Sequence, residues 1–311
     1  MDSQLINLSI NPTYLCNFRC NFCYLTTEQL ADTKKLSINR LSSMISEINK
    51  AGYYPNHVDL YGGEIGLLSE EYLEELDTVL DLQTDASIGV ITNLYKIHPY
   101  FLKDHVDLSV SFDFEARERH ESVMQNIAKI SKPVAVLMLA SPDLLKLDVD
   151  KMILILNAYQ NVVSVEIKPY SANQANSLKV SDLDYEEFVK KWLMSSINKK
   201  FNFVNEEKIK ESLNNTYNAF SDNHVYITPN GKFAVLEFDK NNKEYFMELE
   251  SFSDYLNWTR IEKARVYSNS ICSKCQYLGK CLTEHYREVV SLDKSCNGFK
   301  HLLDWANQSL T

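Results

Sequence analysis

The sequence predicts an α/β protein: a partial (β/α)6 barrel of the TIM type, followed by a small cysteine-rich domain. Strand-like and helix-like segments alternate from residue 4 to about residue 200, an order typical of parallel sheets with right-handed crossovers. Polar residues and glycines follow several of the strand-like segments, where barrel proteins place their active sites. Four of the seven cysteines lie near the end of the chain, which indicates a separate cysteine-rich unit there.

The expected barrel elements are short apolar runs alternating with amphipathic segments. The strands are residues 5–9, 57–61, 87–92, 106–113, 133–140 and 162–167. The helices are residues 36–51, 69–82, 116–130, 147–159 and 182–197, with a short one near 100–104. Ser69 is a suitable N-cap, with Glu70 and Glu71 in the first turn. Six β/α units are two short of a closed barrel, so we expect an open side that admits a bulky substrate.

Three domains follow from this pattern. Residues 1–200 form the barrel, and the polar segment 201–224 is a bridge that is helical in part. Residues 225–311 form the cysteine-rich domain, which opens with a hairpin around Thr228-Pro-Asn-Gly231. Residues 299–310 are expected to form a short amphipathic terminal helix.

Composition excludes several classes of protein. The net charge of −10 argues against a nucleic-acid binder, which would show a basic face. The start of the chain has no basic and apolar regions of a signal peptide, and the longest apolar run, residues 133–140, is too short to span a membrane. We therefore expect a cytoplasmic protein, in which clustered cysteines are metal ligands more often than disulfides.

The first cysteine group is Cys16, Cys20 and Cys23, with the spacing C-x3-C-x2-C. Three thiolates can hold a [4Fe–4S] cluster and leave one iron without a protein ligand. The alternative is zinc, which takes four ligands in structural sites, and no fourth candidate lies close to Cys23.

The second group contains the remaining four cysteines, with the spacing C-x2-C-x5-C-x14-C: Cys272, Cys275, Cys281 and Cys296. Four thiolates close a metal site completely, and both zinc and an iron–sulfur cluster suit this set.

The first group, Cys16-Asn-Phe-Arg-Cys20-Asn-Phe-Cys23, resembles the signature of the radical S-adenosylmethionine (SAM) enzymes. The resemblance implies that the open iron binds SAM and that reductive cleavage of SAM yields a 5′-deoxyadenosyl radical. Phe22 matches the aromatic position that lies by the adenine in this family.

A second motif supports the resemblance. Leu60-Tyr-Gly-Gly-Glu-Ile-Gly-Leu-Leu68 resembles the Gly-Gly-Glu motif of the family, which implies that Gly62, Gly63 and Glu64 hold the SAM amino group. Ile65 stands where the family often has proline. The alternative for Gly62-Gly63 is a plain strand-to-helix turn.

Two further strand ends resemble SAM-binding positions. Thr92-Asn93 resembles a Thr-Asn-Gly motif, with Leu94 in place of glycine. Ser109-Val-Ser111-Phe-Asp113 resembles a strand whose polar residues approach the SAM ribose, although Asp113 is equally suited to cap a helix.

No catalytic residue is singled out by these motifs. Asp113 and His120 resemble an Asp-Gly…His-Asp stretch of peptide-modifying members, with Phe114 in place of the glycine, and His120 also suits an exposed helix position. Lys168 and Tyr170 follow the sixth strand at the expected rim. Asp113, Lys168 and Tyr170 are therefore the catalytic candidates.

The second cysteine group resembles the SPASM extension of radical SAM enzymes, which carries seven cysteines and two auxiliary clusters. Counting from Gly231 places Leu236 where one cysteine would be, and counting from Cys281 places His285 at another. The resemblance implies that the inner cluster is lost and that one auxiliary [4Fe–4S] cluster, or zinc in its place, remains with a structural or electron-transfer role.

Together these features predict an oxidoreductase-type radical SAM enzyme of RiPP biosynthesis. It would abstract a hydrogen from an unactivated carbon of a ribosomally made precursor peptide and form a crosslink or another oxidised product. A flavodoxin or ferredoxin would supply electrons, and a separate protein would recognise a leader peptide, since the barrel begins almost at residue 1. The alternatives are a dehydrogenase or epimerase of a sugar or antibiotic intermediate, and a non-catalytic zinc-bound scaffold. No cysteine is spare as a hydrogen donor, and none of the 18 tyrosines is singled out to replace one.

Overall fold

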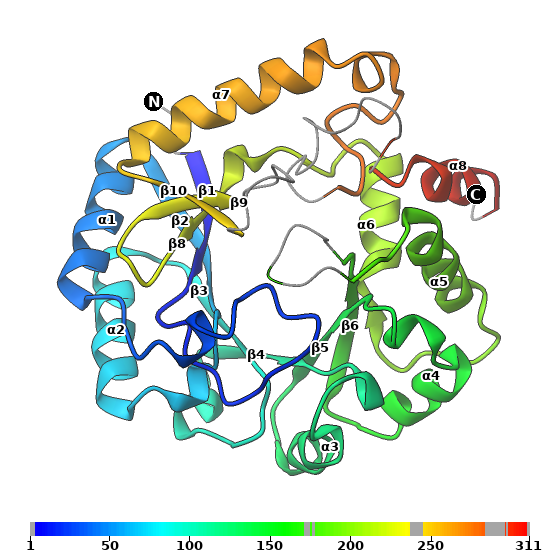
Figure 1. Ribbon diagram of the computed structural model, residues 1–311, viewed down its shortest axis with the longest axis horizontal. Coiled ribbons are helices and arrows are strands. Elements are labelled where there is room, and N and C mark those ends of the chain that lie inside the picture. Colours follow the sequence, from blue (N-terminus) through cyan, green and yellow to red (C-terminus); the bar gives the residue numbers. More distant parts are fainter. Residues whose placement is uncertain are drawn as a thin grey trace.

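The computed structural model describes residues 4–170, 175, 178–236, 245–283, 296 and 298–309. Its centre is a ten-stranded sheet in the order β10-β9-β8-β1-β2-β3-β4-β5-β6-β7, curved so that helices cover its outer side (Figure 1). The strands are β1 (Gln4–Ile10), β2 (Tyr53–Leu60), β3 (Ser87–Thr92), β4 (Val106–Ser111), β5 (Val134–Leu139), β6 (Val162–Lys168), β7 (Asn202–Phe203), β8 (His224–Ile227), β9 (Phe233–Leu236) and β10 (Phe246–Leu249). The helices are α1 (Ile38–Lys50), α2 (Glu70–Gln83), α3 (His120–Lys129), α4 (Val149–Asn157), α5 (Asp182–Met194), α6 (Val204–Leu213), α7 (Phe252–Ser268) and α8 (Lys300–Ser309).

The expected α/β fold class is confirmed. Strands β1 to β6 pair in parallel with their sequence neighbours, and helices lie between them in the chain. The sheet also extends past the six expected strands. The two-residue β7 pairs with β6, and β8 pairs in parallel with β1, with Asn7 opposite His224. The hairpin expected to open the cysteine-rich domain is therefore continuous with the barrel sheet, through β8.

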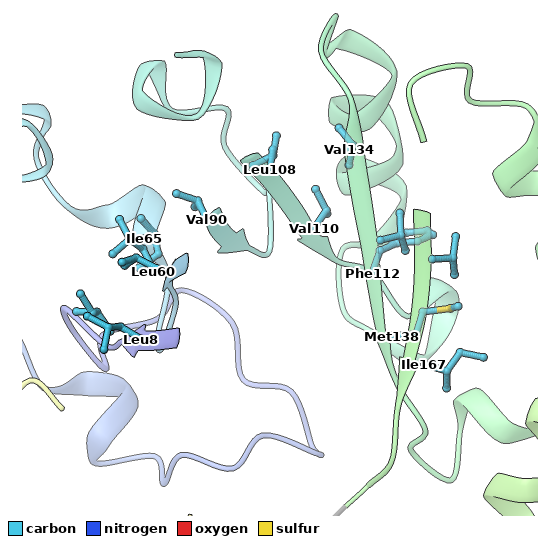
Figure 2. Close-up of a cluster of buried hydrophobic side chains, with 14 of the residues drawn as sticks. Leu8, Leu60, Ile65, Val90, Leu108, Val110, Phe112, Val134, Met138 and Ile167 are labelled. Carbon is cyan, nitrogen blue, oxygen red and sulfur yellow. The ribbon is translucent and has the colours of Figure 1, made fainter. Parts of the chain in front are cut away.

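Side chains that alternate in direction along the strands form the core on one face of the sheet and the cavity wall on the other. Leu60, Val90 and Leu108 come from neighbouring strands and belong to one buried hydrophobic cluster (Figure 2). Residues of the opposite parity, such as Asp59 and Ser111, line a cavity on the other face of the sheet. Because successive side chains of a strand point to opposite faces, the same strands build both the core and the cavity wall.

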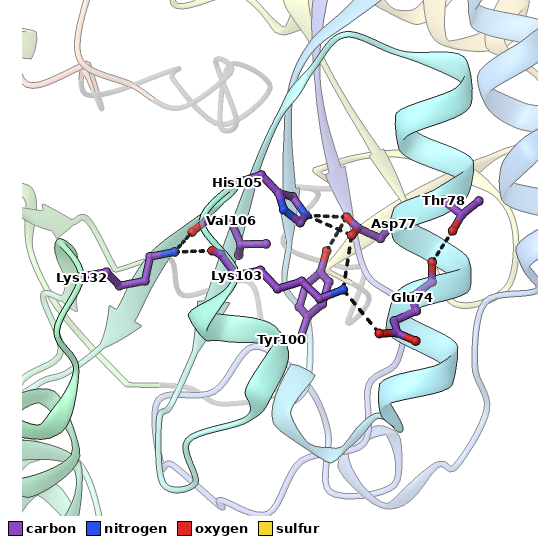
Figure 3. Close-up of polar contacts among 8 residues, drawn as sticks. All are labelled: Glu74, Asp77, Thr78, Tyr100, Lys103, His105, Val106 and Lys132. Atoms are coloured by element: carbon purple, nitrogen blue, oxygen red, sulfur yellow. Dashed lines mark hydrogen bonds and ion pairs between the residues drawn. The ribbon is translucent and has the colours of Figure 1, made fainter.

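A polar network fixes the segment before β4 to helix α2 (Figure 3). The Tyr100 hydroxyl donates to the Asp77 carboxylate over 2.9 Å, and His105 Nε2 lies 3.0 Å from the other oxygen of that carboxylate. The helix expected near residues 100–104 is a 3₁₀ turn, η3 (Pro99–Leu102), that begins with a proline. A proline at the first helical position is favourable because it has no N–H to leave unpaired.

Helix α7, on the outer side of the β8–β10 strands (Figure 1), was not expected. It begins at a capping box, in which the Asp254 amide donates to Ser251 Oγ and the Ser251 amide donates to the Asp254 carboxylate. The signal for this helix was Ser-x-x-Asp, which is weaker than the usual Ser-x-x-Glu. None of the described helices is long and apolar enough to cross a bilayer.

Glu262 on α7 makes the stability of the fold depend on pH. Burial raises the pKa of this carboxyl from 4.5 to about 7, although the Ser221 amide and hydroxyl donate to it. The unfolded chain loses this proton at lower pH than the folded chain. The stabilisation that the protonated Glu262 carboxyl gives to the folded state is therefore complete below about pH 4.5, and it is lost as pH rises through about 7.

We expect the free energy of unfolding of the wild type, minus that of Glu262→Gln, to fall by about 2 kcal/mol between pH 5 and pH 8. Urea unfolding at the two pH values measures this difference. An unchanged difference would show that Glu262 ionises in the folded state as it does in water.

Candidate functional site at the cysteine loop

A cavity of about 540 Å³ lies at the C-terminal ends of the barrel strands. This volume is within the range of small-molecule sites, about 300–1,000 Å³. Most of the residues expected from sequence to form the site line this cavity: Cys16, Cys20, Phe22, Cys23, Gly62, Gly63, Asn93, Ser111 and Lys168. The structure therefore brings together residues that are more than 150 positions apart in the chain.

The cysteines lie on a loop that is closed at its base. Thr13 and Lys35 form an isolated antiparallel bridge, and the Thr13 hydroxyl donates to the Lys34 carbonyl over 3.0 Å. The Cys16 amide donates to the Leu30 carbonyl over 3.1 Å. These contacts bring both ends of the loop to the end of β1.

Gly62 and Gly63 pack directly against the backbone that leads into this loop. The Gly63 amide donates to the Thr13 carbonyl over 2.9 Å, and the Glu64 amide donates to the Leu15 carbonyl over 2.8 Å. A Cβ atom on Gly63 would lie 2.1 Å from the Leu15 oxygen, and Gly62 has a φ of +138°. These glycines are required because two backbone segments approach closely, which a plain turn between β2 and α2 would not demand.

The Glu64 carboxylate is buried and binds protein groups. Its Oε1 accepts hydrogen bonds from the Thr92 hydroxyl over 2.5 Å and the Gly66 amide over 2.8 Å, and its Oε2 accepts from the Asn93 amide over 2.7 Å. Burial raises the pKa of this carboxyl, and the same three donors lower it. Glu64 thus joins the glycine turn to the end of β3, while the backbone of Gly62 and Gly63 borders the cavity.

Asn93 connects the end of β3 to the cysteine loop. Its Nδ2 donates to Asn17 Oδ1 over 2.8 Å and lies 3.9 Å from Cys16 Sγ, and its Oδ1 accepts from the Tyr95 amide over 3.0 Å. Asn17 was not singled out in the sequence, because it lies between cysteines where any residue is expected.

Asp113 is buried behind the cavity wall and holds an arginine. One carboxylate oxygen accepts from the Leu139 amide over 2.6 Å, and the other lies 2.6 Å from both Nε and Nη2 of Arg117. The carboxylate does not cap the 3₁₀ turn that follows, η4 (Phe114–Ala116). Arg117 borders the cavity, and the sequence did not indicate it because it lies in a run of charged residues typical of a solvated helix start.

Lys168 lies at the rim as expected, next to a carboxylate that is 13% exposed. Its Nζ is 3.0 Å from Glu166 Oε1, and Lys208 of α6 binds the same oxygen. Burial raises the pKa of Glu166, but the two lysines outweigh burial and the pKa is lowered. Tyr170 is partly buried, which raises its pKa, and it is not among the residues that border the cavity.

Four tyrosines form a second wall of the cavity: Tyr24, Tyr61, Tyr226 and Tyr245. The rings of Tyr24 and Tyr245 are 4.4 Å apart, and those of Tyr61 and Tyr226 are 6.4 Å apart. Leu236, where the SPASM pattern has a cysteine, is buried in the same cluster. Aromatic side chains therefore surround Leu236.

The thiols of the loop are partly buried. Burial raises the pKa of Cys16 to about 11 and that of Cys20 to about 12, and it also raises the pKa of Cys23. A metal must displace these protons when it binds. Three thiols that border one cavity suit a cluster with an open iron, and the backbone of Gly62 and Gly63 borders the same cavity. Within the described ranges, no three His, Cys, Asp or Glu side chains are already arranged around a metal position.

The C-terminal cysteines also converge. A Cβ atom on Gly298 would lie 2.9 Å from Cys281 Sγ and 3.7 Å from Cys296 Sγ. Burial raises the pKa of the Cys272 thiol to about 11, and the nearby thiols of Cys296 and Cys275 add to this. All seven cysteines lie in described parts of the chain, and none is in a disulfide there. His285 lies outside the described residues.

No protein-family model and no curated protein sequence matches this chain. Solved structures do share its fold. SuiB of Streptococcus suis, bound to S-adenosylmethionine, has a TM-score of 0.65 and 15% identity over 94% of this chain and 75% of its own. Native anSMEcpe with bound AdoMet has a TM-score of 0.70 and 14% identity over 98% of both chains. The barrel fold is thus shared with two proteins that were solved with S-adenosylmethionine bound.

Two related structures contain peptides. SuiB bound to its precursor peptide SuiA has a TM-score of 0.67 and 16% identity over 94% of this chain and 74% of its own. Native anSMEcpe with AdoMet and the Cp18Cys peptide has a TM-score of 0.71 and 13% identity over 98% of both chains. At these identities the likeness concerns the fold.

Proposed function

We propose that this chain is a radical SAM enzyme that abstracts a hydrogen from an unactivated carbon of a precursor peptide. The observation that carries this proposal is the convergence of the cysteine loop, the Gly62-Gly63 turn and the Asn93 corner around one cavity. These are the segments whose sequences resemble the radical SAM signature. The shared fold with proteins solved with S-adenosylmethionine supports the same conclusion.

Different residues of the chain would hold the cluster and SAM. Cys16, Cys20 and Cys23 would ligate a [4Fe–4S] cluster, while the Gly62-Gly63 backbone would bound the SAM site. The cluster and SAM, when bound, supply one-electron cleavage of a carbon–sulfur bond and hydrogen abstraction. Phe22, buried at the cavity wall, and Ser111, on β4, would contact SAM. Glu64 and Asn93 would act indirectly, by fixing the glycine turn and the cysteine loop in place.

A peptide substrate is favoured by the peptides found in two structures of the same fold. In this chain the substrate would lie between the cysteine loop and the wall of four tyrosines. The product would be a crosslink or another oxidative modification, with electrons from a flavodoxin or ferredoxin and leader recognition by a separate protein. A sugar or antibiotic intermediate is the alternative substrate.

The C-terminal cysteines would hold one auxiliary [4Fe–4S] cluster. Cys272 and Cys281 are buried, Cys281 and Cys296 lie near Gly298, and Cys275 and Cys296 lie near Cys272, an arrangement that suits a closed four-thiol site. Zinc suits the same ligands and remains the alternative at this position.

Metal counting tests both sites. We expect about eight irons per reconstituted wild-type chain and about four in Cys272→Ala/Cys275→Ala, because each site would hold four. The matched variant Cys16→Ala/Cys20→Ala should also keep about four irons but lose all 5′-deoxyadenosine formation from SAM and dithionite.

Mass spectrometry of candidate peptides after turnover then tests the substrate class. A mass change in a peptide encoded by a neighbouring short open reading frame would support the peptide, whereas a change in a sugar or antibiotic intermediate would support the alternative. Protein that binds zinc, lacks [4Fe–4S] absorption and leaves SAM intact would contradict the proposed function and favour a zinc scaffold.

A further inference from the structure

Three consecutive residues between β4 and α3 each contact the cysteine loop. Arg117 Nη1 lies 3.6 Å from Cys20 Sγ. The Glu118 carboxylate accepts a hydrogen bond from the Arg19 amide, and the Arg119 guanidinium lies 5.6 Å from the centre of the Phe18 ring. We call residues 117–119 the loop clamp, because all three hold the segment that carries the cysteines.

Arg117 is the member of the clamp that contacts a sulfur, and its guanidinium is held by Asp113 and by the ring of Phe22. Nε and Nη2 bind one oxygen of Asp113, so Nη1 is the nitrogen directed at Cys20. The guanidinium lies 5.0 Å from the centre of the Phe22 ring, and its side chain is 12% exposed. A planar guanidinium held by a carboxylate and an aromatic ring cannot turn away from the sulfur without breaking both contacts.

The backbone on either side of Arg117 is strained. Phe114 and Arg119 have φ values of +50° and +56°, a region that is unfavourable for a residue with a side chain. Such strain persists where surrounding contacts over-determine the conformation, and it gathers at functional sites. Here the two left-handed residues lie on either side of Arg117 in the chain.

Arg117 brings a positive charge to Cys20, because its Nη1 lies 3.6 Å from Cys20 Sγ. The nitrogens that bind Asp113 are Nε and Nη2. Nη1 can therefore donate to the sulfur while the ion pair with Asp113 is kept. Hydrogen bonds and positive charge at ligand sulfurs stabilise the reduced, more negative state of an iron–sulfur cluster.

We propose that Arg117 is a positioning residue that donates a hydrogen bond to the Cys20 thiolate and raises the reduction potential of the cluster on the cysteine loop. Asp113 acts through Arg117, because it orients the guanidinium and is itself held by the Leu139 amide. This inference rests on the proposed function, in that Cys16, Cys20 and Cys23 carry a cluster.

The test compares Arg117→Gln with Arg119→Gln in the full reconstituted chain. Arg119 contacts the rings of Phe18 and Tyr95 and belongs to the same clamp, but no contact joins it to a sulfur among the described residues, so it controls for loosening of the loop. Redox titration followed by electron paramagnetic resonance gives the midpoint potential of the cluster whose signal changes when SAM is added.

At the wild-type midpoint potential we expect the ratio of reduced to oxidised cluster to fall at least tenfold in Arg117→Gln and less than twofold in Arg119→Gln. Arg117→Lys should lie between them, because it keeps the charge and loses the fork. Equal potentials for the two glutamine variants would overturn the inference. Arg117→Gln leaves the Asp113 carboxylate buried without its cation, so Asp113→Asn/Arg117→Gln serves as a second variant without that unpaired charge. We expect the same fall in the ratio of reduced to oxidised cluster in this double variant.

A cobalt titration separates this inference from the proposed function. Iron and sulfide counting shows whether the loop takes up a cluster, and an empty loop in the wild type would contradict the proposed function alone. Co²⁺ is then added to metal-free Cys272→Ala/Cys275→Ala, in which the C-terminal four-thiol site is removed, so that the bands report on the cysteine loop. A sulfur-to-cobalt band at higher energy in this protein than in the same protein carrying Arg117→Gln supports the hydrogen bond, and identical bands, or no band at all, refute it.

Discussion

Substituting Gly63 by alanine is expected to prevent the cysteine loop from docking on the barrel. The new Cβ would lie 2.1 Å from the Leu15 oxygen and 2.4 Å from the Tyr14 oxygen. Both are backbone atoms, so the segment before Cys16 must move and the hydrogen bond from the Glu64 amide to the Leu15 carbonyl is lost. We expect a loss of about 3 kcal/mol or more in the free energy of unfolding, together with the loss of the iron bound at the first cysteine group.

Gly52→Ala is the matched control for this effect. Gly52 also has a positive φ, of +83°, but no atom lies within 4 Å of its would-be Cβ. Only the backbone penalty of about 1–2 kcal/mol then applies, and iron content should stay at the wild-type value. Urea unfolding and iron counting measure both variants. A Gly63→Ala protein as stable and as iron-rich as Gly52→Ala would show that the two segments do not touch in solution.

Asp113→Asn is expected to have the second largest effect. The substitution removes the buried negative charge that pairs with Arg117. The Arg117 side chain is only 12% exposed, so its guanidinium is left largely buried without a counter-ion. Breaking a buried ion pair in this way costs about 3–5 kcal/mol. The asparagine amide also cannot accept from both Arg117 and the Leu139 amide as the carboxylate does.

Two comparisons give this prediction its control. Asp143→Asn breaks the exposed pair with Lys146, whose side chains are 49% and 72% exposed, and should cost at most about 1 kcal/mol. Replacing both partners, in Asp113→Asn/Arg117→Met, should cost less than the sum of the single changes, because no unpaired charge remains. Additive costs in the urea unfolding cycle would mean that Asp113 and Arg117 are not paired.

The parts of the fold that follow local rules were predictable. Buried parallel strands are apolar runs, and the helices between them carry caps such as Ser69, so β1 to β6 and the helices around them lie close to their expected positions. The edges of the sheet were not predictable in the same way. Strand β7 has two residues, and β8 joins the barrel by pairing with β1, a contact that no local pattern encodes.

At the site, the sequence indicated which segments meet but not what each side chain binds. The cysteines and the two glycines border the expected cavity because their spacing reflects backbone geometry. Glu64 and Asp113 are different, since a carboxylate at a strand end can face either a ligand or a neighbouring backbone amide. Their partners, Thr92 and Arg117, depend on tertiary packing. Arg117 was missed because the left-handed Phe114 and Arg119, which turn the charged run inward, have no signature in residue type.

The pairing of β8 with β1 also has a consequence for how the molecule assembles. Asn7 and His224 face each other across more than two hundred intervening residues, and contacts of such sequence separation form slowly because a long loop must first close. The N-terminal β/α units can form from local contacts before that happens. The tyrosine wall includes Tyr226 of β8, so we expect the cysteine loop to stay accessible to water, iron and oxidants during folding until β8 has paired with β1.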